Sequence, residues 1–479
     1  MRVEAARSVG WTFIEASSAQ TILLVIFLIL ARLLTPAEYG LMALATTVLG
    51  VPQFILSNGL IPVIINRESL SDDELSTAFW VSLGIGAFLT LLILVCAAPL
   101  AWLLRNPDLA PILRWSSLSF LFTALGNVPS ALYQRRLQYR VFAIRSVASF
   151  LGGGAVGITM ALQGYGVWSL VGNLLVQSAI SGTVLWVGAG WHPRLHFDLR
   201  LLNQIRENLS HTIAGNFLTS LTTRVDMLII GWFSSEYLGY YYFVQRLLLT
   251  ISVGTYVPIG NVLLPVLTRA RNDVAGLREP FVFMLWTAQV LWMPVVAGLG
   301  AIAPVVVPNV FGVNWTGAVP LLQIISLTAL TACLYQFTYS ILLTAGRASI
   351  YPFLTLAQLL LTSGLLILAM RSGLEAIGWA YVAASLATAI IHLSAVHVVL
   401  GIAFGEMIMR LGSVVAATIA MVLAVLWVGR EMHALSPWII LPSQVALGAL
   451  VYVGVLFAIA RSDTNRLTST VISLASRTA

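Results

Sequence analysis

The sequence predicts an all-α integral membrane protein with about 14 transmembrane helices. Of its 479 residues, 59% are hydrophobic and only 9% are charged, whereas roughly 25% are charged in a typical soluble domain. The apolar runs are roughly 20 to 30 residues long, enough to cross a bilayer, and they show no period-two alternation. Because backbone polar groups in lipid must pair within the protein, only helices or closed barrels span a membrane, and these runs favour helices.

Hydropathy places each span and leaves only short connections between them. The first run lacks a small-x-small cleavage site and is too long for a signal-peptide core, so we interpret it as a membrane helix. Cys96 and Cys333 fall inside apolar runs, which predicts free thiols and no disulfide framework. The predicted spans are 8–31, 40–65, 77–104, 110–133, 141–163, 166–190, 207–233, 237–266, 281–307, 317–344, 349–370, 374–400, 410–429 and 436–460.

Arginines gather in alternate connections. With the N-terminus inside, 18 arginines fall on the cytoplasmic side, 5 on the outer side, and 2, Arg224 and Arg246, within spans. This asymmetry follows the positive-inside rule and predicts that both termini are cytoplasmic. It also accounts for the net charge of +7, so we predict no nucleic-acid partner.

The first twelve spans contain an internal repeat. Four short motifs recur in the same order after six spans, an even number, so both halves enter the membrane in the same direction as parallel repeats. The matched pairs are Glu38-Tyr39-Gly40 with Glu236-Tyr237-Leu238-Gly239, Pro62 with Pro265, Ala98-Pro99 with Ala303-Pro304, and Gly166-Val167-Trp168 with Gly378-Trp379. We therefore predict an N-lobe at 1–190, a polar cytoplasmic linker at 191–206, a C-lobe at 207–400, and two further helices with a cytoplasmic tail at 401–479.

Several stretches resemble bacterial Wzx-type oligosaccharide flippases, polysaccharide transporters of the superfamily that also holds multidrug exporters and lipid II flippases. They are ARLLTPAEYGLMALA (31–45), STAFWVSL (76–83), DMLIIGWFSSEYLGYYYF (226–243) and VLLPVLTRARND (262–273). The resemblance implies two six-helix bundles in a V-shaped arrangement plus two C-terminal helices. It also implies movement of undecaprenyl-diphosphate-linked repeat units to the periplasmic leaflet of the bacterial inner membrane, alongside the pathway's polymerase and export proteins. Lipid II flippases carry arginines inside the first helix, whereas here Glu15 lies inside and Arg32 at the outer end, which counts against lipid II as the cargo.

A diphosphate and hydrated sugars need a polar, cationic cavity to cross the bilayer, and arginine pairs with phosphate bidentately. Arg224 and Arg246 lie equally far along the chain from the turn at Ser235, which predicts the same depth and a shared diphosphate clamp. Asp226 is then a counter-ion or a cation site. The alternative is an internal Arg–Asp pair that joins two helices.

Three further residues are candidates. Arg145 at the start of the fifth span is a second diphosphate contact or a side chain that extends to the interface. Tyr241 is a sugar-stacking ring or part of an interfacial aromatic belt. Glu15 is a site for H⁺ or Na⁺ coupling or an acceptor of hydrogen bonds within the helix bundle.

Other function classes fit less well. A membrane glycosyltransferase or polymerase needs acid–base residues gathered on a sizeable outer loop, and the predicted outer loops carry single carboxylates. We therefore predict no catalytic residues, no metal site and no cofactor other than a coupling H⁺ or Na⁺. An ion-coupled multidrug exporter of the same fold remains the nearer alternative, although the predicted cavity is positive.

Overall fold

The computed structural model describes residues 2–59, 61–65, 71–197, 222–269, 274–402, 404–432, 435–461 and 463–464, and the regular structure of this part of the chain is helical. For residues 2–17 and a few single positions only the backbone is described. The chain forms two compact units, Met1–Tyr242 and Phe243–Ala479.

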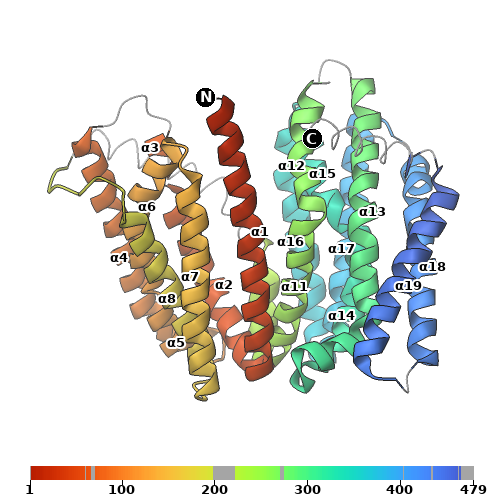
Figure 1. The fold of residues 1–479 in the computed structure, drawn as a ribbon, viewed down its shortest axis with the longest axis horizontal. Helices are drawn as coiled ribbons and strands as arrows, with labels where there is room; N and C mark the ends of the chain where they lie inside the picture. Colours follow the sequence, from red (N-terminus) through yellow and green to blue (C-terminus); the bar gives the residue numbers. More distant parts are fainter. Residues whose placement is uncertain are drawn as a thin grey trace. The chain divides into compact units, whose positions relative to one another are not determined.

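The first unit contains α1 to α10 and the start of α11 (Figure 1). Its helices are α1 (Arg2–Leu33), α2 (Pro36–Gly59), α3 (Ile61–Ile65), α4 (Asp72–Leu103), α5 (Leu109–Ser116), α6 (Ser119–Arg135), α7 (Tyr139–Leu162), α8 (Trp168–Trp186), α10 (Val225–Phe233) and the first turns of α11 (Ser235–Gly254). The helices that follow in the second unit are α12 (Tyr256–Arg269), α13 (Val274–Val306), α14 (Ala318–Ser326), α15 (Ala332–Thr344), α16 (Tyr351–Ala369), α17 (Leu374–Leu400), α18 (Phe404–Glu431) and α19 (Pro437–Ile459).

The chain is a multi-pass α-helical membrane protein. Among the described residues, 11 helices are long and apolar enough to cross a bilayer, or 12 when α11 and α12, bent by 48°, count as one span. These twelve coincide with twelve of the fourteen predicted spans. The predicted first span coincides with α1, and most of the predicted seventh span lies outside the described residues.

Hydroxyl-bearing caps define where two of the helices begin. At α4 the Ser71 hydroxyl accepts from the Glu74 backbone N–H at 3.2 Å, and the Glu74 carboxylate accepts from the Ser71 N–H at 2.9 Å. At α2 the Glu38 carboxylate accepts from the Thr35 N–H at 2.7 Å, and the Thr35 hydroxyl accepts from Glu38 N–H at 3.4 Å. Each arrangement is a capping box, which satisfies backbone N–H groups that the first turn leaves unpaired.

Small residues bring the helices of the first unit together, where α7 packs on α8 and α6 on both α4 and α8. A side chain at Gly153 of α7 would lie 2.8 Å from the Asn173 carbonyl of α8, and one at Gly157 would lie 3.1 Å from the Ser169 carbonyl. Glycines at this four-residue spacing allow close helix packing in lipid, where the hydrophobic effect does not drive helices together. The α4, α6, α7 and α8 ribbons accordingly run side by side (Figure 1).

The structure adds a feature to the internal repeat. The predicted fourth and tenth spans are both interrupted, by a turn after Ser116 between α5 and α6, and by a 3₁₀ segment after Ser326 between α14 and α15. Both breaks occupy the same place in their half of the sequence. The two halves therefore share the order of helices and the position of one helix break.

The division between the compact units falls within α11, after Tyr242, because α10 packs against α2 of the first unit. Of the predicted linker 191–206, the described part lies on α4. The Arg194 N–H donates to the Ser76 hydroxyl at 3.0 Å, and the Trp80 indole donates to the Arg194 carbonyl at 2.8 Å. The lobe boundaries inferred from the repeat stay a prediction.

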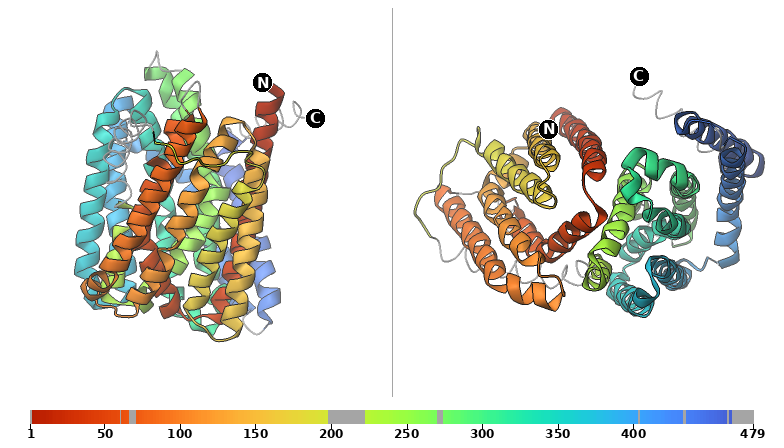
Figure 2. Two further views of the ribbon diagram at one scale, coloured as in Figure 1. Left: turned by 90° about the vertical axis from the view of Figure 1, so that its left-hand side faces the viewer. Right: turned by 90° about the horizontal axis from the view of Figure 1, so that it is seen from below.

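In the second unit, α18 and α19 pack on α13 (blue helices in Figure 2). Trp286, Met421 and Tyr452 belong to the buried apolar cluster between them. Arg410 of α18 pairs with Glu279 of α13 at 2.7 Å and with Asp463 at 3.1 Å. These ion pairs join α18 to the start of α13 and to the segment after α19.

Candidate functional site: a polar cavity in the first unit

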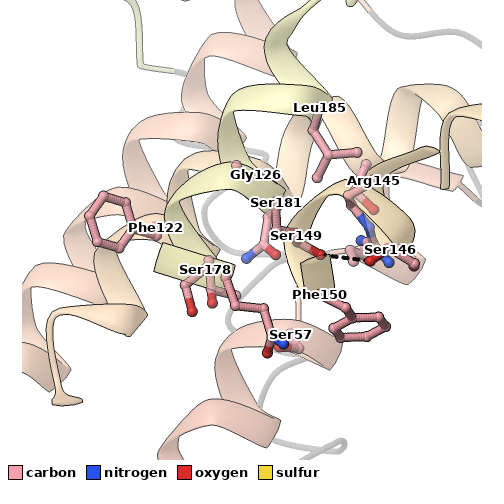
Figure 3. Close-up of a pocket in the computed structure, with 16 residues that line it drawn as sticks. Ser57, Phe122, Gly126, Arg145, Ser146, Ser149, Phe150, Ser178, Ser181 and Leu185 are labelled. Carbon is pink, nitrogen blue, oxygen red and sulfur yellow. Dashed lines mark hydrogen bonds between the residues drawn. The ribbon is translucent and has the colours of Figure 1, made fainter. Parts of the chain in front are cut away.

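A polar cavity of about 310 Å³ lies between helices of the first unit (Figure 3). Ten of its sixteen lining residues have a polar side chain, and Arg145 is the only one that carries a charge. The polar residues are Ser57, Thr123, Asn127, Ser130, Arg145, Ser146, Ser149, Gln177, Ser178 and Ser181.

The cavity lies toward one end of the first unit. α2 and α8 contribute residues from their C-terminal halves, α6 contributes residues between Phe122 and Ser130, and α7 contributes residues from its first three turns. These helix ends face the connection that holds Arg135, Arg136 and Arg140, which the positive-inside rule places in the cytoplasm. The cavity therefore lies nearer the predicted cytoplasmic side.

Arg145 lies on the second turn of α7, half-buried beside the cavity. Its guanidinium carbon lies 5.0 Å from the centre of the Phe142 ring, in cation–π contact. In Figure 3 its side chain lies close to Ser146 and Leu185. The predicted site residue thus lines a cavity rich in hydroxyl groups.

Hydrogen bonds organise the wall beside Arg145. The Gln53 amide donates to the Thr123 hydroxyl at 2.9 Å, and the Asn127 amide donates to the Leu56 carbonyl and the Ser82 hydroxyl, both at 3.0 Å. The Ser149 hydroxyl donates to the Ser146 carbonyl at 3.2 Å. A hydroxyl that donates its one proton still carries two lone pairs with which it can accept a hydrogen bond.

These hydroxyl and amide groups were not among the residues predicted from the sequence, because the prediction rested on ionisable residues. A signal was present, since Ser146 with Ser149 and Ser178 with Ser181 repeat at the i, i+3 spacing that puts side chains on one helix face. Thr123, Asn127 and Ser130 share one face of α6 at the i, i+4, i+7 spacing. Polar stripes inside apolar spans predict a polar cavity when stripes from neighbouring helices face one another.

The predicted pair of Arg224 and Asp226 has separate partners. The Arg224 guanidinium donates to the Thr46 carbonyl of α2 at 3.5 Å and lies against Gly50, where a side chain would overlap it. Asp226 accepts from the Tyr241 hydroxyl at 2.6 Å and from the Met227 N–H at 2.8 Å. Arg224 is half-buried, while the Tyr241 side chain is fully buried. In this conformation Tyr241 is therefore a partner of Asp226 within the helix packing.

The other two predicted residues are placed separately. Arg246 lies half-buried on the part of α11 that belongs to the second unit, so its joint clamp with Arg224 stays a prediction. The side chain of Glu15 lies outside the described residues, and ion coupling through it stays a prediction as well.

A second cavity, of about 390 Å³, lies in the second unit between α13, α18 and α19. Its lining is apolar apart from Gln444 and Tyr452. The Gln444 amide donates to the Val425 carbonyl at 3.1 Å and the Tyr452 hydroxyl to the Val290 carbonyl at 2.9 Å. The chain thus offers a polar cavity in one unit and an apolar cavity in the other.

Comparison with known proteins connects this geometry to a family. The model of the family described as polysaccharide biosynthesis protein matches residues 29–320. The succinoglycan biosynthesis transport protein of Rhizobium meliloti is 26% identical over 414 residues, covering 85% of this chain and 80% of that protein. The teichuronic acid biosynthesis protein of Bacillus subtilis is 26% identical over 377 residues, covering 78% of each chain.

Solved structures share the fold. A lipid II flippase in an inward closed conformation matches with a TM-score of 0.75 and 13% identity, over 95% of this chain and 99% of that one. An inward-facing multidrug exporter matches with a TM-score of 0.65 and 15% identity, over 80% of this chain and 95% of that one. At these identities the similarity establishes the architecture, not the cargo.

Proposed function

The chain belongs to the polysaccharide biosynthesis protein family, and we propose that it is a flippase that moves lipid-linked oligosaccharide repeat units from the cytoplasmic to the periplasmic leaflet. The observation that carries this proposal is the polar cavity at Arg145. Sugar hydroxyls leave water only where other hydrogen-bonding groups replace it, because an unpaired polar group in an apolar medium costs roughly 2–7 kcal/mol. Serine, threonine, asparagine and glutamine supply those groups here.

The charge of the cavity suits the diphosphate of such a lipid. Arginine stays protonated and its planar fork matches phosphate oxygens, and Arg145 is the only charged residue among the sixteen described residues of the lining. The volume of about 310 Å³ is at the lower end of the range for ligand sites, roughly 300–1,000 Å³. It accommodates part of the headgroup, while the polyprenyl tail has apolar surroundings in the bilayer.

The charge also separates this proposal from the multidrug exporter of the same fold. A cationic drug is stabilised by carboxylates, and none of the sixteen lining residues is acidic. The proposal involves no covalent chemistry, so the chain acts as a transporter and not as an enzyme. A polymerase and export proteins of the same pathway then use the delivered units. We also propose H⁺ or Na⁺ as the coupling ion, with Glu15 and Asp226 as the candidate residues that bind it.

Reconstitution tests the proposed function. Purified protein in proteoliposomes is expected to move undecaprenyl diphosphate carrying a fluorescently labelled oligosaccharide between leaflets, measured as the added fraction of label that an impermeant quencher reaches. A fluorescent phospholipid without sugar or diphosphate is the matched control and is expected not to move faster. Equal rates in protein-containing and empty vesicles for the sugar lipid would contradict the proposal.

The proposed orientation, in the inner membrane with both termini inside, has its own test. Arg105 and Arg136 are both exposed and follow α4 and α6 at opposite ends of the first unit. Single cysteines beside them, in a chain without Cys96 and Cys333, are expected to react with an impermeant maleimide on intact cells only near Arg105. Labelling near Arg136 from outside would reverse the topology.

A further inference from the structure

The recurring motifs Glu38-Tyr39-Gly40 and Glu236-Tyr237-Leu238-Gly239 touch one another in the structure. Gly40 stands four residues after Pro36, the first residue of α2, and Gly239 stands four residues after Ser235, the first residue of α11. All of these residues belong to the first unit. They lie at the predicted outer ends of the two helices.

The contact is backbone on backbone and it is reciprocal. A side chain at Gly40 would overlap the carbonyl oxygen of Ser235, and a side chain at Gly239 would overlap the carbonyl oxygen of Pro36. Each glycine thus lies against the first residue of the other helix, close enough for Cα–H···O contacts of the kind that recur between packed helices. A larger side chain at either place meets backbone, which cannot rotate away.

In a two-fold arrangement of two similar halves, if position i of the first half contacts position j of the second, then position j of the first also contacts position i of the second. Here the equivalent residues come from the two sequence repeats. The caps agree, because the Thr35 hydroxyl accepts from Glu38 N–H at 3.4 Å and the Ser234 hydroxyl accepts from Tyr237 N–H at 3.2 Å. Both helices therefore begin at matching positions and present matching carbonyls.

Two side-chain contacts surround the glycines. The Asn106 amide, in the loop after α4, donates to the Ser235 hydroxyl at 2.6 Å. The Arg105 guanidinium lies 4.4 Å from the centre of the Trp232 ring. Arg105 is exposed. Separation of the two helix ends would break the Asn106–Ser235 hydrogen bond, the Arg105–Trp232 contact and the glycine crossing.

We propose that the Gly40–Gly239 crossing is the outer gate of the transport path, closed in this conformation and separated when cargo leaves on the outer side. Parallel repeats that rock against each other open one side of the protein at a time. A contact between equivalent residues of the two repeats at the outer side therefore breaks when that side opens. Glycine is required because only a residue without a side chain permits the closed contact. This inference rests on the proposed function.

The test uses Asn106→Cys with Ser235→Cys in a chain lacking Cys96 and Cys333, treated in membranes with a short, reductant-cleavable thiol crosslinker. We expect crosslinked protein to form and flipping of the labelled sugar lipid to stop, and we expect cleavage of the linker to restore it. Adding Gly40→Leu is expected to hold the gate open, which lowers crosslink yield several-fold and raises labelling of the two cysteines from outside. Gly84→Leu on α4 is the matched control, because a side chain there meets nothing within 4 Å.

Undiminished flipping by fully crosslinked protein would contradict the proposal that this contact is the outer gate. Equal crosslink yields with Gly40→Leu and with Gly84→Leu would overturn the role of the glycines. Crosslink yield and thiol labelling do not depend on the cargo. If crosslink yield and thiol labelling change as expected while the uncrosslinked parent moves no sugar lipid, the proposal of an outer gate is supported and the proposed function is contradicted.

Discussion

Replacing Arg145 with alanine is expected to abolish polymer export while the amount of protein in the membrane stays unchanged. Arg145 is the only charged residue among the sixteen described residues that line the polar cavity. Hydrogen bonds to charged groups contribute roughly 1.5–3 kcal/mol each, so losing two of them to a diphosphate lowers affinity by roughly two to four orders of magnitude. Secreted polysaccharide from a deletion strain carrying the variant, with an immunoblot of its membranes, measures both quantities.

Two variants sharpen this expectation. Arg145→Lys should restore export only in part, because lysine keeps the charge and loses the planar fork. Arg140→Ala is the matched control, since Arg140 lies on the first turn of the same helix, is exposed and does not line the cavity. Wild-type export by a stable Arg145→Ala protein would remove Arg145 from the site.

Gly50→Leu is expected to reduce export strongly even though every charge in the chain is retained. A side chain at Gly50 would occupy the place of the Arg224 guanidinium, which is the movable end of a long side chain. The substitution therefore displaces the guanidinium from its position beside Thr46 and leaves the protein folded. If Arg224 binds the diphosphate from this position, Gly50→Leu and Arg224→Ala both lower flipping in proteoliposomes, and Gly84→Leu does not.

The alternative role of Arg224 gives a different result. If its bond to the Thr46 carbonyl only holds α2 against the segment before α10, then Arg224→Ala lowers the amount of protein in the membrane. Normal flipping by a stable Arg224→Ala, Arg246→Ala double variant would end the hypothesis of a clamp between the two arginines.

The membrane spans could be predicted from the sequence because the requirement behind them is local. Each crossing of a bilayer needs about 20 consecutive apolar residues whatever the neighbouring helices do. The predicted spans 141–163 and 374–400 accordingly coincide with α7 and α17. The repeat was also visible, because equivalent positions such as Gly40 and Gly239 carry the same residue type.

The sites depend on which helix faces meet, and that is a property of tertiary packing. Ser146 and Ser178 are two polar residues in separate apolar runs until α7 and α8 approach through Gly153 and Gly157. Tyr241 has the same sequence context whether its hydroxyl faces sugar or, as found, donates to Asp226. Hydropathy measures transfer of a segment into lipid and contains no information on the direction of a side chain around its helix. For that reason the sequence alone accounts for the membrane architecture, and only the packed structure brings Arg145 together with the hydroxyls and Gly40 together with Gly239.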